Sequence, residues 1–117
     1  MALMITENAF STRKEVEKEI EGANLWMLEL QLEGGSGKPH WHEFYGQVYI
    51  IEGELTIRDE SNGTTHTCGA GTRIVVPPRS LHSELAGGAK VLVGLAIDPA
   101  TLGEEVDLPP AALAEAH

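Results

Sequence analysis

Three histidines are the residues of this sequence whose types and spacing could support chemistry together. His40 and His42 stand one residue apart in a stretch rich in β-forming residues. Side chains at i and i+2 of a β-strand share a face, so both imidazoles should point one way and Trp41 the other. A third histidine, His82, follows a run of β-branched residues and a Pro-Pro turn.

These residue types suggest a metal site. Neutral imidazole is the commonest protein ligand for zinc, iron, nickel and copper, and a catalytic site needs about three protein ligands beside an open position. His40, His42 and His82 could supply such a set. The alternative is that three of the five histidines are exposed or hydrogen-bonded groups without a metal.

The two histidine-bearing stretches together resemble the two motifs of the cupin superfamily. The first motif is commonly written G-x5-H-x-H-x3-4-E-x6-G and the second G-x5-P-x-G-x2-H-x3-N. The residues that fit them are His40, His42 and Gly53 in the first and Gly71, Pro77 and His82 in the second. The resemblance implies an all-β jelly-roll barrel and favours the metal site over the alternative.

The first motif lacks its usual glutamate. Counting back from Gly53, the position falls on Gly46, and counting forward with the longer spacer it falls on Gln47. Gln47 is a possible fourth ligand, because its amide oxygen can bind a metal or orient a metal-bound water. Gly46 would instead leave a gap for water or substrate, and the strand register decides between them. The second motif's glycine and asparagine are replaced by Arg79 and Ala86.

The missing carboxylate shapes the expected function. Within the cupins, a three-histidine set without it resembles iron dioxygenases that act on diketones, thiols or hydroxylated aromatic acids. We therefore expect a three-histidine Fe(II) dioxygenase for a small polar or anionic molecule, with zinc, nickel or manganese as other candidate metals. The alternatives are a non-redox isomerase or lyase, a binding module for a small, for example sugar-like, ligand with zinc or nickel, and a structural barrel with a vestigial site.

Other side chains are candidates for the pocket. Tyr45, Tyr49 and Trp26 could line its mouth, although aromatic residues of small barrels also form core or dimer contacts. Arg73 could bind an anionic substrate through two hydrogen bonds if its side chain turns inward.

The elements that must position these residues are mostly strands. A half-buried strand is expected from Asn24, because residues 28–33 alternate between leucine and polar residues. Further strands are expected at 48–51, 54–58, 64–68, 72–76, 82–85 and 90–97. Gly53 should mark a bend and Gly87-Gly88 a turn, and Asn62-Gly63 suits a hairpin. Many short strands with glycine turns predict an all-β sandwich or barrel.

The two ends of the chain are less regular. Thr12 and Glu15 could form a capping box for a helix through Ile20, and an extended arm is the alternative for residues 6–21. A single helical turn could start at Pro110. We expect one domain over residues 1–117, with the barrel core at about 24–98.

Composition narrows the class of protein. Eight basic and 18 acidic residues give a formal net charge of −10 without a basic cluster, which argues against nucleic-acid binding. No apolar run is long enough for a membrane span, and no secretory signal is visible. The single cysteine, Cys68, suits a reducing compartment. We expect a soluble cytoplasmic protein that binds a small molecule and forms a homodimer through residues 25–30.

Overall fold

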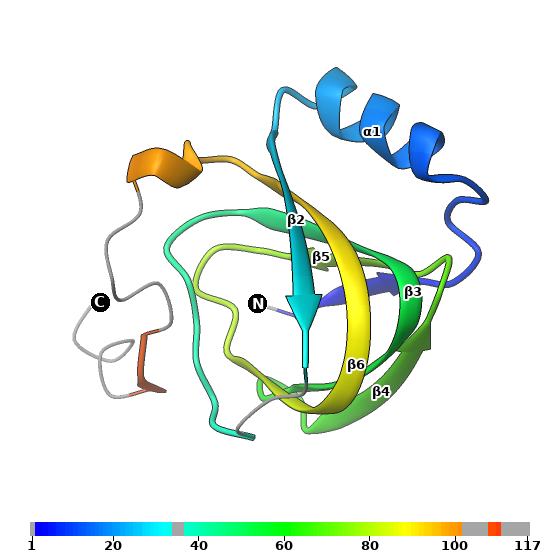
Figure 1. Ribbon diagram of the computed structural model, residues 1–117. Helices are drawn as coiled ribbons and strands as arrows, with labels where there is room; N and C mark the ends of the chain where they lie inside the picture. The colour runs from blue at the N-terminus through cyan, green and yellow to red at the C-terminus, as the bar shows by residue number, and fades with distance from the viewer. Residues whose placement is uncertain (1, 34–36, 102–107, 111–117) are drawn as a thin grey trace.

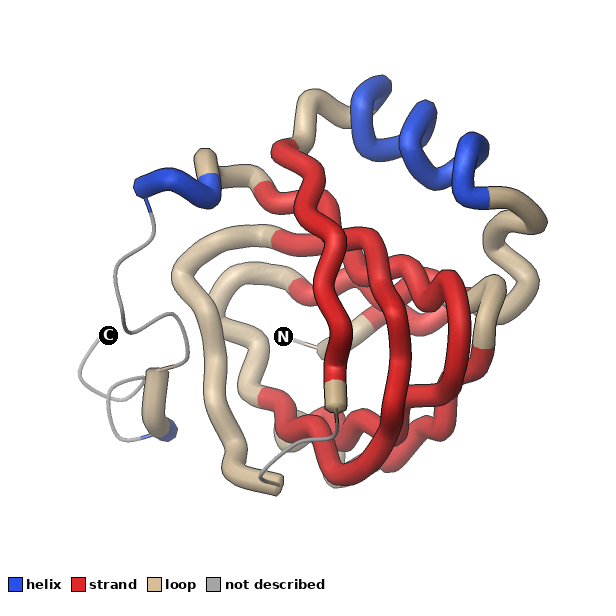
Figure 2. The backbone as a smooth tube through the Cα atoms, in the orientation of Figure 1, coloured by secondary structure: helices blue, strands red, loops and turns tan. Residues whose placement is uncertain are grey.

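The fold is an antiparallel sheet that curls into a barrel, with a helix outside it (Figures 1 and 2). A computed structural model describes residues 2–33, 37–101 and 108–110. The elements in these ranges are β1 (Met4–Thr6), α1 (Arg13–Gly22), β2 (Trp26–Leu32), β3 (Gly46–Asp59), β4 (Thr64–Gly69), β5 (Arg73–Val76), β6 (His82–Leu95) and a short 3-10 helix, η1 (Pro99–Thr101). The all-β prediction is confirmed.

Two long strands form the frame of the barrel. The strand order is β1-β5-β3-β6-β2, and β4 pairs with the second half of β3. β3 and β6 have 14 residues each and pair antiparallel from Gly46↔Leu95 to Asp59↔His82. This pairing fixes the start of β6, and with it His82, at one end of the barrel.

Glycines within β3 and β6 let these strands bend sharply. From the sequence, the strands were expected to end at these glycines. Gly53 and Gly87 have positive φ angles, +84° and +147°. A Cβ at Gly53 would lie 1.9 Å from the carbonyl oxygen of Gly88, and one at Gly87 would lie 2.6 Å from that of Glu54. The two backbones therefore approach too closely for a side chain. The predicted turn at Gly87-Gly88 was wrong, because β6 is continuous through it.

Strand alternation sends side chains to an inner and an outer apolar cluster. The inner cluster lies inside the barrel and consists of buried residues that include Ile50, Leu55, Ile74 and Val91. The outer cluster joins the sheet to α1 and contains Val16, Ile20, Tyr49 and Leu92.

The outer cluster explains why the segment before β2 is helical. Val16 and Ile20 of α1 are 0% and 1% exposed, so the helix buries one face against the barrel. Thr12 caps it by accepting a hydrogen bond from the backbone N–H of Glu15 at 3.3 Å. The helical interpretation is therefore the right one, whereas β1 was not predicted.

A short piece of the C-terminal region covers Trp41. Leu108 and Trp41 exchange two backbone hydrogen bonds of 3.0 and 3.1 Å, and the indole Nε1 donates to the carbonyl of Pro109 at 2.8 Å. Trp41 is 1% exposed as a result. The helical turn suggested after Pro110 lies outside the described residues. No helix in the described ranges is long and apolar enough to cross a membrane.

We predict that the chain forms a homodimer through β2. This strand ends the strand order of the sheet, and Trp26, Met27 and Leu30 on it are 52%, 47% and 42% exposed. Light scattering should give twice the chain mass at micromolar concentration, and Met27→Lys should lower it to the monomer mass. The control Met4→Lys on β1 changes a similarly exposed methionine and should leave the mass unchanged. A monomer mass for the parent chain would contradict the prediction.

Candidate metal centre

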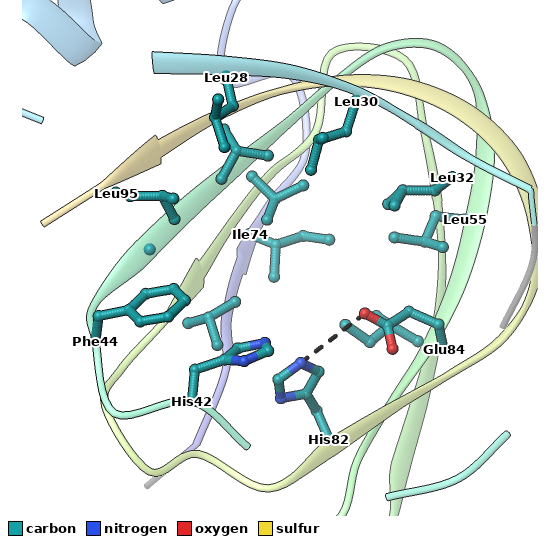
Figure 3. A pocket seen from close by; sticks show the side chains of 15 residues that line it. Leu28, Leu30, Leu32, His42, Phe44, Leu55, Ile74, His82, Glu84 and Leu95 are labelled. Atoms are coloured by element: carbon teal, nitrogen blue, oxygen red, sulfur yellow. Dashed lines mark ion pairs between the residues drawn. The ribbon is translucent and has the colours of Figure 1, made fainter. Parts of the chain in front are cut away.

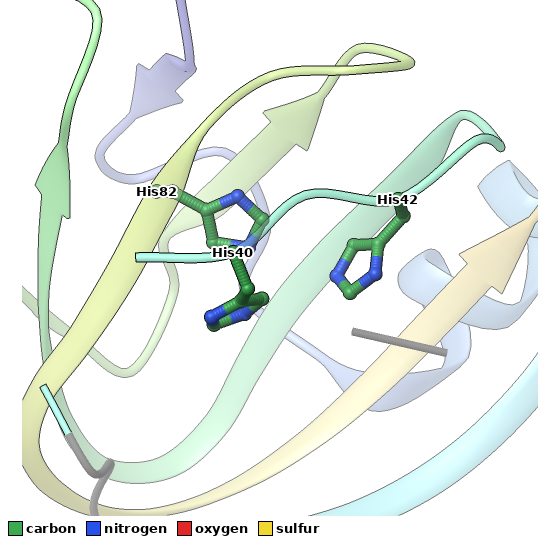
Figure 4. A group of neighbouring side chains, drawn as sticks. All are labelled: His40, His42 and His82. Carbon is green, nitrogen blue, oxygen red and sulfur yellow. The ribbon is translucent and has the colours of Figure 1, made fainter. Parts of the chain in front are cut away.

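The three histidines meet because the segment that carries His40 pairs with the start of β6. His40 N–H donates to the carbonyl of His82 at 2.8 Å, and His82 N–H donates back at 2.9 Å. The ring centroids lie 4.5 Å apart for His40 and His82, 5.3 Å for His42 and His82, and 5.4 Å for His40 and His42 (Figure 4). One ring nitrogen of each lies within 4.8 Å of the other two.

Backbone carbonyls hold two of the rings in the form that binds metals. The Nδ1–H of His82 donates to the carbonyl of Ser80 at 2.8 Å, and the Nδ1–H of His40 donates to that of Lys38 at 3.0 Å. A neutral imidazole that donates from Nδ1 keeps its lone pair on Nε2. Such hydrogen bonds are the usual means of orienting metal-binding histidines.

Burial also keeps His82 neutral. Its side chain is 3% exposed, and desolvation lowers the pKa of His82 below its usual value despite the opposing effects of Ser80 and Glu84. A lower pKa means that the imidazole stays unprotonated to a more acidic pH. His82 therefore presents the neutral form that a metal requires.

A carboxylate that the sequence analysis missed stands beside the histidines. Glu84 lies two residues after His82 on β6, and its Oε2 is 3.1 Å from Nε2 of His40. Its Oε1 is 3.9 Å from Nε2 of His82 (Figure 3). Burial opposes ionisation, but the contact with His40, and to a smaller extent the nearby His82 ring, hold the pKa of Glu84 below its usual value.

The signal for Glu84 was present in the sequence. His82-x-Glu84 has the same i, i+2 spacing as His40-x-His42, so the two side chains share a face of their strand. The glutamate of the cupin motifs belongs to the first motif, so Glu84 in the second motif was not predicted.

A cavity of about 390 Å³ extends from this polar end into the barrel. Its walls are mainly aliphatic and come from β2, β3, β5 and β6, and His42, His82 and Glu84 gather at one end (Figure 3). The lining residues are Leu28, Leu30, Leu32, His42, Phe44, Gly46, Val48, Leu55, Ile57, Ile74, Val76, His82, Glu84, Val93 and Leu95. Most of this surface can contact only an apolar group.

The register of β3 places Gly46, and not Gln47, at the cavity. Gly46 and Val48 line it, so Gln47 between them points to the outer side of the sheet. There the Gln47 amide donates to the hydroxyl of Tyr45 at 2.7 Å and accepts from that of Tyr49 at 2.5 Å. Gln47 is therefore not placed to act as the fourth ligand.

The other predicted pocket residues also lie away from the cavity lining. Tyr49 donates to Glu19 of α1 at 3.0 Å, and Arg73 pairs with the same carboxylate at 2.5 Å. Desolvation first, and then the hydrogen bond to Glu19, raise the pKa of Tyr49. Trp26 is half exposed on the edge strand. Strand parity explains the position of Tyr49, because residues at odd positions of the first half of β3 face α1.

The donor set fits a divalent transition metal. Three imidazole nitrogens converge, and rotation of a histidine ring about its second side-chain torsion is soft, so small movements can bring them within bonding distance of one ion. Imidazole with carboxylate suits zinc, iron, nickel and manganese. The chemistry of the donors therefore agrees with a cation site at this end of the cavity.

A curled antiparallel sheet that encloses a cavity with converging histidines defines a class of small-molecule-binding barrel. Comparisons with known proteins agree with this class. Residues 28–90, which are more than half of the chain, match the model of the family described as the AraC-like ligand binding domain. No curated protein matches the chain.

Solved structures resemble the fold. An RmlC-like cupin from Shewanella frigidimarina superposes with a TM-score of 0.52 and 22% identity over 67% of this chain and 71% of that one. A protein from Neisseria meningitidis gives a TM-score of 0.50 and 24% identity over 60% and 72%. The barrel has the cupin jelly-roll fold, and the chain belongs to the family described as the AraC-like ligand binding domain.

We predict opposite outcomes for a glutamate at two neighbouring positions of β3. A Cβ at Gly46 meets only ordinary contacts, the nearest 3.4 Å away at Leu95, so Gly46→Glu should place a carboxylate in the cavity. This variant should bind Zn(II) more tightly. The metal-free variant should be less stable than the metal-free parent by about 1–3 kcal/mol in free energy of unfolding, because the new carboxylate is buried without partners.

Gln47→Glu is the matched control for this prediction. It adds the same charge one residue away, on the face that contacts Tyr45 and Tyr49. Its Zn(II) affinity, measured by calorimetry, should equal that of the parent. Tighter binding by Gln47→Glu and unchanged binding by Gly46→Glu would mean that the register of β3 is reversed.

Proposed function

We propose that this protein binds a divalent transition metal through His40, His42 and His82 and uses it to act on a small molecule held in the cavity. The observation that carries the proposal is the convergence of three imidazole nitrogens within 4.8 Å of one another at the polar end of an apolar cavity. The family description as a ligand-binding domain supports a small-molecule ligand.

The cavity walls support a particular shape of ligand. A volume of about 390 Å³ is in the range of pockets for small molecules. Leucine, isoleucine and valine side chains surround most of it, so the ligand has an apolar body. Its polar head would face the histidines and Glu84. This modifies the expectation of a simply polar or anionic substrate, and no arginine or lysine is among the lining residues.

The reaction that we propose first is an Fe(II)-dependent dioxygenation. Iron held by imidazoles would supply the redox chemistry that dioxygen activation needs. His40 and His82 would be held in position by their hydrogen bonds to backbone carbonyls, and the leucines of β2 would contact the apolar body of the substrate.

A second candidate is a non-redox reaction with zinc or manganese. The specific observation in its favour is Glu84, because the dioxygenase interpretation relied on a ligand set without a carboxylate. Oxygen donors suit manganese, and zinc accepts both imidazole and carboxylate. An isomerase or lyase would use such a centre to polarise a carbonyl group.

We predict that His82→Ala abolishes tight metal binding and preserves the barrel. The inner core consists of residues such as Ile50, Leu55 and Val91, which pack without His82. Calorimetric titration with Zn(II) should show one site in the parent and none in the variant, while circular dichroism stays similar. His66→Ala on β4 is the control and should bind like the parent. A parent chain that binds no stoichiometric metal would overturn the proposal.

Oxygen consumption separates the two reactions. Protein loaded with Fe(II) should consume oxygen when supplied with diketones, thiols or hydroxylated aromatic acids, and molecules with apolar substituents should be better substrates because of the cavity walls. The His82→Ala variant should not consume oxygen above background. Turnover that is supported by Zn(II) and independent of oxygen would instead establish the non-redox reaction.

A further inference from the structure

We propose that Glu84 is the fourth protein ligand of this metal centre, supplied by β6 where β3 offers only Gly46. The inference rests on the proposed metal centre. It adds a residue outside the first-motif position, and it changes the charge of the ligand set from neutral to −1.

The first argument is the direction of the Glu84 side chain. Glu84 lies two residues after His82 on the same strand, and both line the cavity. Its side chain is 26% exposed, and its carboxylate lies 3.1 Å from Nε2 of His40. Figure 3 shows the same carboxylate beside His82, whose Nε2 is 3.9 Å away. The carboxylate and the imidazoles therefore share one space.

The second argument is the ring nitrogen that the carboxylate contacts. Nδ1 of His40 lies against the carbonyl of Lys38, and the Glu84 Oε2 lies 3.1 Å from the other ring nitrogen, Nε2. The carboxylate therefore lies beside the nitrogen of His40 that would bind the ion.

The third argument is the distance itself. Two ligands that bind one ion at about 2.1 Å, with an angle of about 90–110° between them, lie about 3.0–3.4 Å apart. The separation of 3.1 Å between Nε2 of His40 and Oε2 of Glu84 falls in this range. Glu84 and His40 are thus spaced as adjacent ligands of one ion.

A carboxylate ligand limits which substrate heads the centre accepts. Three neutral imidazoles and one carboxylate reduce the charge of a divalent ion to +1. A head group with a single negative charge, such as a carboxylate or an enolate, would complete a neutral site in this apolar cavity. A dianionic head would leave a net negative charge there.

The test compares Glu84→Gln with the parent and with Glu54→Gln. Glu54 lies on β3, opposite Gly88 and exposed, so its variant makes the same charge change away from the histidines. Co(II) and Zn(II) affinities are measured by chelator competition, and the visible spectrum of the Co(II) form reports the ligands. We expect Glu84→Gln to weaken binding about 10- to 100-fold and to alter the Co(II) spectrum. Glu54→Gln should match the parent in both.

Each other result has a definite meaning. Parent-like affinity and spectrum in Glu84→Gln would overturn the inference and leave the three-histidine centre standing. Weaker binding with an unchanged Co(II) spectrum would make Glu84 a positioning residue for His40, which also overturns it. No metal binding by the parent would overturn the proposed function itself. If Glu84→Gln fails to fold, Glu84→Asp takes its place. Its shorter carboxylate should still weaken metal binding and alter the Co(II) spectrum, and parent-like values of both would overturn the inference.

Discussion

The pairing of β3 with β6 is the constraint on which the rest of the structure depends. The strands run together for nearly their whole length and bend at the same place, where Gly53 and Gly87 let the backbones approach. His82, the first residue of β6, pairs with Asp59, the last residue of β3, at one end of the barrel. Asp59 is buried and accepts hydrogen bonds from the backbone of Leu3 and from Ser61, which fixes this end. The candidate centre is built there.

Alternation along β3 then separates two environments that differ in chemistry. Inward positions such as Gly46 and Val48 meet the apolar cavity. Outward positions meet a polar network under α1, in which Tyr49 and Arg73 share the carboxylate of Glu19. Because the period of a strand is two, a shift by one residue would exchange these sets. The outer network therefore supports the site indirectly, by fixing the register that points Gly46 inward.

The candidate centre draws its ligands from two short i, i+2 pairs on neighbouring segments. His40 and His42 form one pair, and His82 and Glu84 form the other, joined by the two backbone hydrogen bonds between His40 and His82. A backbone bridge between ligand-bearing segments makes the site rigid before a metal arrives, which lowers the cost of assembling it. It also explains why the carboxylate can come from β6 without a change in the barrel.

The sequence alone determined the histidine set, the all-β class and most strand positions, because these depend on local periodicity and on motif spacing. It did not determine the continuity of β6, since Gly87-Gly88 reads as a turn until β3 is placed against it. Nor could it place Gln47, Tyr49 and Arg73, because the face that a strand turns to the cavity depends on its partners and on α1. The sequence showed that Glu84 shares a face with His82, but only the pairing of β6 with the segment of His40 placed its carboxylate beside that ring. Contacts between residues distant in the chain made these choices, and such contacts leave no local pattern to read.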